Sequence, residues 1–196
     1  MFPALLLALV GGVALLLFGR AWAGPSVDKR LVRQLIDLAV RDQAAATLLL
    51  RQHPDLLHAR TLHDQTLLHF CAAEGQAEGV RFLARAGVPV DATNEVGDTA
   101  LVDAVSQGDL QMARLLLRLG ASPDAASRTR GCVLHIAVGT GNAALVEALL
   151  GAGARADYVT SFGETLSDAL RKAGPRRAEL SQVLERRSVS PVREAP

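Results

Sequence analysis

The side chains most able to carry chemistry in this 196-residue chain are five histidines and two cysteines. The histidines are His53, His58, His63, His69 and His135. No two of them lie four residues apart with a glutamate between, the spacing that presents two zinc ligands on one helix face. A zinc site needs three or four converging ligands. The spacing therefore predicts no metal site.

The two cysteines, Cys71 and Cys132, are too few for a disulfide framework or a four-cysteine zinc site. We expect each thiol to be buried as a small apolar side chain. For Cys132 there is an alternative to this structural role. It lies where a helix is expected to begin, and a helix N-terminus lowers the pKa of a thiol. A redox-sensitive thiol at Cys132 is therefore the second hypothesis.

The rest of the sequence contains no familiar catalytic pattern. Gly139-Thr140-Gly141 and Gly151-Ala152-Gly153 are glycine-rich, but the Gly-Lys-Ser/Thr of a phosphate loop does not follow either of them. There is no Gly-x-Ser-x-Gly elbow. A net charge of +1 and an aromatic content of 4% are untypical of a nucleic-acid binder. We predict a protein that is not an enzyme, with no cofactor and no nucleic-acid partner.

The strongest signal in the sequence is an internal repeat of 33 residues. Glycines recur at this step from residue 75 onward. Five columns share the step: Gly75, Gly108, Gly141 and Gly174; Thr66, Thr99, Cys132 and Thr165; Leu83, Leu116 and Leu149; Gly87, Gly120 and Gly153; Asp91, Asp124 and Asp157. Such agreement predicts a chain built from stacked copies of one structural unit.

Each unit has the pattern of two short helices. Thr66 is expected to open the first helix and Gly75 to end it, because glycine adopts the left-handed conformation at low cost. Apolar residues at three- and four-residue spacing, such as Leu110, Ala113 and Leu116, predict the second helix. A single pair cannot bury its own apolar stripe, so the units must stack.

These residues resemble the ankyrin repeat family. The similarity rests on the 33-residue period, on the Thr-Leu-Leu-His string at 66–69 and on the Leu-x-x-Gly-Ala-x-x-Asp ending at 117–124. The resemblance implies an all-α solenoid of stacked helix-turn-helix units with short hairpin loops. It also implies that His69 and His135 hydrogen-bond the backbone of a neighbouring turn. The proline of the family motif is absent, and Leu67, Ala100 and Val133 take its place.

The repeats are predicted to span residues 61–174, between two capping segments. Residues 25–60 continue the register with polar substitutions and form an N-terminal capping repeat, with Ser26 as the expected N-cap. Residues 175–187 are expected to form a C-terminal capping helix with Leu180, Val183 and Leu184 as its apolar stripe. Residues 188–196 are expected to be a flexible tail.

Residues 1–24 are expected to direct the chain to a membrane. Residues 2–18 carry no charge, which predicts an N-terminal hydrophobic helix, and seventeen residues are the low end of a bilayer span. As an uncleaved anchor, this segment would leave the repeats in the cytoplasm, because the nearby arginines and lysine follow it. Alternatively it is a signal peptide cleaved after Ala23, at the small-x-small site of residues 21–23.

The resemblance implies a protein partner, bound by the hairpin tips and by the exposed side of each first helix. The positions are Leu62, His63, Gln65 and Glu74 in the first full unit, Glu95, Val96, Asp98 and Gln107 in the second, Arg128, Thr129, Arg130 and Thr140 in the third, and Tyr158 and Phe162 in the fourth. This surface is expected to run from an acidic patch to a basic one, with aromatic residues at the far end. The predicted function is a non-enzymatic protein-binding module tethered to a membrane, or an exported inhibitor or accessory protein.

Overall fold

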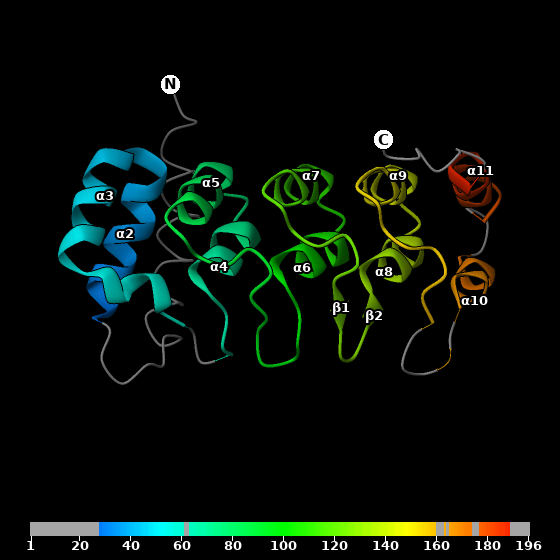
Figure 1. Cartoon of the computed structure of the whole chain (residues 1–196), viewed down its shortest axis with the longest axis horizontal. Helices are drawn as coiled ribbons and strands as arrows, with labels where there is room; N and C mark the ends of the chain where they lie inside the picture. The colour runs from blue at the N-terminus through cyan, green and yellow to red at the C-terminus, as the bar shows by residue number, and fades with distance from the viewer. Residues whose placement is uncertain (1–27, 61–62, 160–162, 164, 174–176, 189–196) are drawn as a thin grey trace, which may run out of the picture.

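The computed structural model describes residues 28–60, 63–159, 163, 165–173 and 177–188. Successive helices form antiparallel pairs that stand side by side (Figure 1). The pairs are α2 (Lys29–Arg41) with α3 (Gln43–Gln52), α4 (Leu67–Ala73) with α5 (Ala77–Arg85), α6 (Ala100–Ser106) with α7 (Leu110–Arg118), α8 (Val133–Thr140) with α9 (Ala143–Gly151), and α10 (Leu166–Lys172) with α11 (Arg177–Ser188). A 3-10 helix, η2 (Pro54–His58), follows the first pair.

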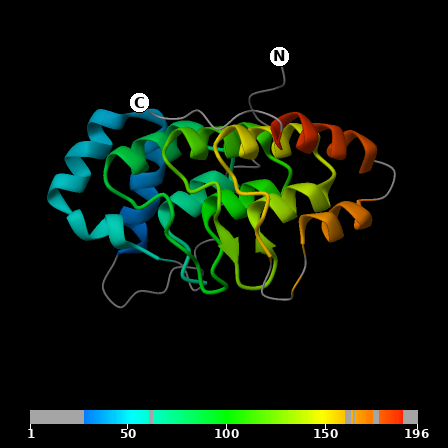
Figure 2. The same ribbon diagram turned by 45° about the vertical axis from the view of Figure 1, so that its right-hand side comes forward.

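The pairs build two rows of helices. The inner row consists of α4, α6, α8 and α10, and the outer row of α5, α7, α9 and α11 (Figure 1). The loops that join one pair to the next project from the inner row, and Figure 2 shows them on the same side after the turn of the view. One loop forms a small hairpin, with β1 (Ala126–Ser127) antiparallel to β2 (Gly131–Cys132). The predicted all-α solenoid with hairpin loops is confirmed for the described residues.

The threonine and glycine columns have a direct structural cause. The hydroxyl oxygens of Thr66, Thr99 and Thr165 each accept a hydrogen bond from the backbone N–H three residues later, which caps the first helix of the unit. Gly75 has a φ of 68° and follows α4, where a side chain would strain the backbone. The threonine column therefore marks the start of α4, α6 and α10, and Gly75 follows the end of α4.

The aspartate column connects consecutive units. The Asp91 carboxylate accepts a hydrogen bond of 2.9 Å from the backbone N–H of Ser122. One unit later, Asp124 accepts one of 2.8 Å from the backbone N–H of Arg155. Each carboxylate thus ties its own turn to the corresponding turn of the next unit.

The core is continuous from the first pair to the last. Leu68, Leu101 and Leu134 from the inner row are at most 1% exposed. Leu83 and Leu116 from the outer row are fully buried. All five side chains belong to one hydrophobic core, and apolar burial is the main favourable contribution to the folding free energy. The stack therefore depends on its interfaces, as expected for a solenoid.

The N-terminal cap differs from its prediction in detail. Helix α2 begins at Lys29, and its N-cap is Asp28 rather than Ser26: the Asp28 carboxylate accepts a hydrogen bond of 2.8 Å from the N–H of Arg30. Asp42 replaces the turn glycine without a left-handed backbone, because its φ is −148°. Its carboxylate instead caps α3 by accepting hydrogen bonds from the N–H groups of Ala44 and Ala45.

At the other end of the stack, the apolar stripe predicted for the capping helix is confirmed. Leu180, Val183 and Leu184 of α11 are buried. The predicted N-terminal hydrophobic helix and most of the predicted tail lie outside the described residues. Within the part of the chain that the structure describes, no helix combines the length and apolar character needed to cross a bilayer.

Candidate protein-binding surface

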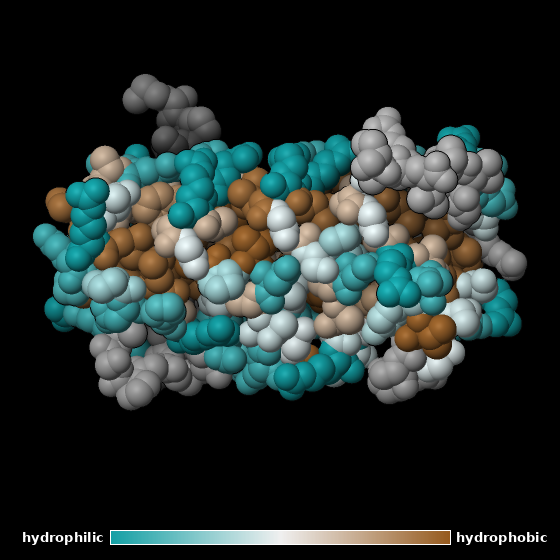
Figure 3. Space-filling model, viewed as in Figure 1, coloured by the Kyte–Doolittle hydropathy of each residue, from teal (hydrophilic) through white to brown (hydrophobic). Residues whose placement is uncertain are grey.

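The hairpin tips and the ends of the inner helices form one edge of the stack, which we call the hairpin surface. Figure 3 shows hydrophilic residues along this lower edge and apolar residues between the rows of helices. The structure places the predicted residues His63, Glu74, Glu95, Val96, Gln107, Arg128, Thr129 and Arg130 in exposed positions, and Gln65, Thr140 and Tyr158 in half-buried ones. Leu62 and Phe162 lie outside the described residues.

The first two hairpin tips contact each other directly. Nδ1 of His63 lies 2.7 Å from Oε1 of Glu95. The backbone N–H of Glu95 also donates a hydrogen bond of 3.1 Å to the carbonyl oxygen of His63. These two predicted residues therefore belong to one continuous surface that spans two units.

Asp98 is not exposed, although its position in the repeat predicts that it belongs to the binding surface. It is 1% exposed, and its Oδ2 accepts a hydrogen bond from Nη2 of Arg130 in the next unit. A buried carboxylate needs a cation because it has lost its hydration. Asp98 therefore acts as the internal counter-ion of Arg130, and the expectation that it faces a partner is wrong.

The same arginine holds two further side chains of the second unit. Nη2 of Arg130 donates a hydrogen bond of 3.1 Å to Oδ1 of Asp103, and Nη1 donates one of 2.7 Å to Oγ of Ser106. Burial raises the pKa of Asp103, and the hydrogen bond from Arg130 opposes that rise. The guanidinium of Arg130, in the third unit, thus bonds to three side chains of the second unit and holds the two units together. The predicted separation into an acidic and a basic patch fails at this point, because the opposite charges neutralise each other across the unit boundary.

His69 joins the first hairpin to the second. Its Nε2 donates a hydrogen bond of 3.0 Å to the carbonyl oxygen of Asp98, and its Nδ1 accepts one of 2.8 Å from the hydroxyl of Thr66. Burial lowers the pKa of His69. The imidazole is therefore neutral at pH 7 and carries its proton on Nε2. The predicted hydrogen bond from His69 to a neighbouring turn is confirmed.

We expect His69 to make the stability of the fold depend on pH. Its folded pKa lies below the unfolded value of about 6.5, so the unfolded chain binds more protons and the free energy of unfolding falls as the pH drops below about 6.5. Protonated Nδ1 could no longer accept from Thr66. Urea titrations at pH 7.5 and 5.0 should show the advantage of wild type over His69→Gln shrinking at the lower pH. An equal difference at both values would contradict the assignment.

The cysteines are both buried and unpaired by disulfide. Burial raises the pKa of Cys71 to about 12 and also raises the pKa of Cys132. The alternative of a helix-activated thiol at Cys132 is therefore not supported, because burial outweighs the effect of the helix N-terminus. Cys132 occupies the capping position of α8, but its side chain makes no capping hydrogen bond, and Sγ contacts Nδ1 of His135 instead.

Replacing Cys132 by threonine should stabilise the third unit. Threonine would accept from the N–H of His135 and donate to its Nδ1, as Thr66 does with His69. N-capping side chains are worth about 1 kcal/mol, so Cys132→Thr is expected to raise the free energy of unfolding by roughly that amount. Urea unfolding of the two proteins measures it. The converse variant, Thr66→Cys, is the control and should lose a similar amount.

Several residues that organise the hairpins went unrecognised in the sequence. Oδ1 of Asn94 accepts hydrogen bonds from the backbone N–H groups of Val96 and Asp98. Oγ of Ser127, which is 33 residues later, accepts from those of Thr129 and Arg130. The 33-residue step and the tendency of Asn and Ser to hydrogen-bond nearby backbone could have indicated this column. Nothing in the sequence pattern indicated Ser106 as a partner of Arg130.

The hairpin surface also carries apolar, cationic and aromatic side chains that remain at least partly exposed. Val96 is 40% exposed at the second tip, and Val159, which is not among the predicted surface residues, is 53% exposed next to Tyr158 in the sequence. Arg128 is exposed and lies across Gly97, where an added β-carbon would be 2.8 Å from its Cγ. Tyr158 packs edge-on against His135, with ring centroids 6.0 Å apart. Arginine and tyrosine are frequent energetic anchors of interfaces.

No three His, Cys, Asp or Glu side chains converge into a possible metal site among the described residues.

The family model described as "Ankyrin repeats (3 copies)" matches residues 35–127, from within α2 to the end of β1. No match to the chain was found among curated proteins. Beyond residue 127, α8 and α9 repeat the helix pair with Gly141 and Gly153 at positive φ. Ankyrin repeats bind other proteins, and it is to the ankyrin repeats that residues 35–127 of this chain are similar.

Proposed function

We propose that this chain is a non-enzymatic module that holds a partner protein against the hairpin surface. The observation that carries the proposal is that some hairpin residues bond neighbouring units together, whereas others remain exposed. Asp98, Arg130 and His69 join the units, whereas Val96 and Arg128 are exposed at the edge of the stack and Tyr158 is half-buried there. A surface with apolar, cationic and aromatic side chains over consecutive units suits a protein ligand.

The binding surface can be tested with a variant that leaves the unit boundaries intact. Partners recovered by cross-linking and mass spectrometry from wild type should be lost with the double variant Val96→Asp, Arg128→Glu, which changes two exposed side chains. Arg130 is unsuitable for this purpose, because its substitution would break the ion pair with Asp98. Arg114→Glu, on the outer row, is the matched control for the change in charge. Equal recovery of every partner by wild type and the double variant would count against this surface.

We further propose that residues 1–24 place the module at a membrane. The support is the uncharged stretch of residues 2–18, followed by Arg20, Lys29, Arg30 and Arg33. An anchor of this polarity leaves the repeats on the cytoplasmic side. Binding would then recruit or restrain the partner close to the bilayer.

An exported inhibitor or accessory protein is the second candidate function. It is supported by Ala21-Trp22-Ala23, a small-x-small site of the kind that signal peptidases cleave. N-terminal sequencing of the protein isolated from cells that produce the full chain distinguishes the two. A chain that begins at Gly24 supports export, and a chain that begins at Met1 supports the anchor.

A further inference from the structure

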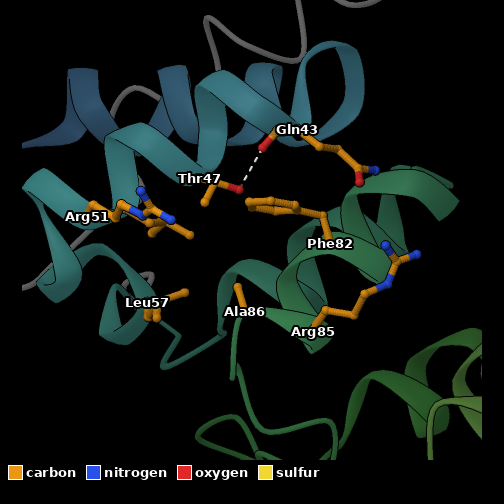
Figure 4. A pocket seen from close by; sticks show the side chains of 8 residues that line it. Gln43, Thr47, Arg51, Leu57, Phe82, Arg85 and Ala86 are labelled. Carbon is orange, nitrogen blue, oxygen red and sulfur yellow. Dashed lines mark hydrogen bonds between the residues drawn. The ribbon is translucent and has the colours of Figure 1, made fainter.

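A recessed surface, separate from the hairpin surface, lies on the outer row, on the side opposite the hairpins. It is a groove of ≈ 430 Å³ between α3, η2 and α5. Leu50 and Leu57 form part of its wall, and the ring of Phe82 points into it from α5 (Figure 4). None of these side chains belongs to the hairpin surface, so the groove is independent of the function proposed above.

The groove exists because the first pair is built differently from the others. Helix α2 has 13 residues, whereas α4 has 7, and α5 packs against α2. Helix α3 instead continues into η2, which leaves the space between α3 and α5 open. Further along the stack, α9 packs against both α7 and α11, and the groove between α7 and α9 is smaller, at ≈ 320 Å³.

Two arginines stand at the ends of the larger groove. In Figure 4, Arg51 lies on one side of Phe82, and Arg85 lies with Gln43 on the other. Both arginines are exposed, and neither makes an ion pair with a residue that the structure describes. Arg81, on the same helix as Arg85, does pair with Glu78 at 3.3 Å. The groove therefore presents an apolar wall between two positive charges that the described fold does not neutralise.

We propose that this groove binds an acidic peptide segment of a partner protein. A large apolar side chain of the segment packs on Phe82 and Leu57, and carboxylates on either side of it pair with Arg51 and Arg85. The side-chain amide of Gln43 is available to a backbone group of the peptide. The argument is one of charge complementarity, since the two guanidiniums flank the apolar contact and would repel a basic segment.

A peptide fits these features better than an anionic bilayer does. The apolar wall is recessed, and Phe82 is only 7% exposed, so a flat membrane would meet the arginines but not the ring. A side chain that projects from a peptide can reach both. An anionic bilayer is therefore a competing outcome of the test rather than part of the proposal.

The test uses the full-length protein and a fluorescein-labelled synthetic peptide in which two central leucines are flanked on each side by two glutamates. Fluorescence anisotropy should show binding at concentrations below about 1 mM. The double variant Arg51→Glu, Arg85→Glu should weaken this binding by at least about tenfold, because it replaces both attractions by repulsions. Thr47→Tyr, which fills the groove from α3, should abolish binding, with circular dichroism confirming that the fold is retained.

The matched control is Arg114→Glu, Arg118→Glu, which makes the same change of charge at the smaller groove. It should change the affinity by less than about twofold. Equal weakening by both double variants would overturn the proposal, because it would indicate general attraction to a basic surface. Absence of peptide binding at about 1 mM would also overturn it, as would equal binding of a peptide with serines in place of the leucines. Binding to phosphatidylserine vesicles that requires Arg51 and Arg85, without peptide binding, would assign the groove to a membrane instead.

Discussion

Replacing Arg130 by methionine is expected to lower the free energy of unfolding by roughly 3 kcal/mol, the lower end of the range for breaking a buried ion pair. The lower end applies because the side chain of Arg130 is 39% exposed, whereas that of Asp98 is 1% exposed. The variant keeps the aliphatic stem but removes the cation. Asp98 then remains buried without a counter-ion, and its Oδ1 already has no hydrogen-bond partner among the described residues.

Urea unfolding followed by circular dichroism measures this loss. Arg128→Met is the matched control: it removes an exposed arginine from the same hairpin and should change the stability by less than about 0.5 kcal/mol. The double variant Asp98→Asn, Arg130→Met should recover part of the loss, because no buried charge is left. An Arg130→Met protein as stable as wild type would show that the ion pair does not join the units.

Leu116→Ala should have an effect of similar or larger size, roughly 3–4 kcal/mol. Leu116 is fully buried in α7, at the centre of the stack. The truncation loses the apolar contact and leaves a cavity that rigid neighbouring helices cannot fill. Since each unit contacts only its neighbours, weakening the central one weakens the interfaces on both of its sides.

The same urea titration provides the measurement, and Leu48→Ala provides the control. Leu48 is 57% exposed on α3, so its truncation removes little buried surface and should cost less than about 0.5 kcal/mol. A loss below about 1 kcal/mol for Leu116→Ala would mean that the centre of the stack can collapse around the cavity.

Buried His69 is connected by hydrogen bonds, through Asp98, to the exposed Arg130 of the hairpin surface. Its imidazole is bonded to the carbonyl of Asp98, and the carboxylate of Asp98 is bonded to Arg130. One chain of hydrogen bonds therefore runs from the first full unit to the third. Substitutions in this hydrogen-bond network are expected to alter partner binding through the shape of the hairpins. Substitutions of Val96 or Arg128 would instead change exposed side chains that contact the partner.

The sequence alone determined the architecture. A step of 33 residues shared by threonine, glycine, leucine and aspartate columns was sufficient to predict paired helices and their stacking. Thr66 and Gly75 could be assigned to the two ends of a helix because capping and positive φ depend on neighbours only a few residues away. The buried stripe of the last helix, which includes Leu180, follows from helical periodicity in the same way.

The tertiary structure alone decided which charged residues serve the fold and which remain free. Asp98 and Arg130 are 32 residues apart, and their pairing depends on how one hairpin stands beside the next. The same holds for burial at Cys132, which raises its pKa against the local effect of the helix, and for the groove at Phe82, which α3 and α5 create by standing apart. Local patterns report interactions within a unit, whereas these features arise between units, where contact depends on three-dimensional placement rather than on spacing in the sequence.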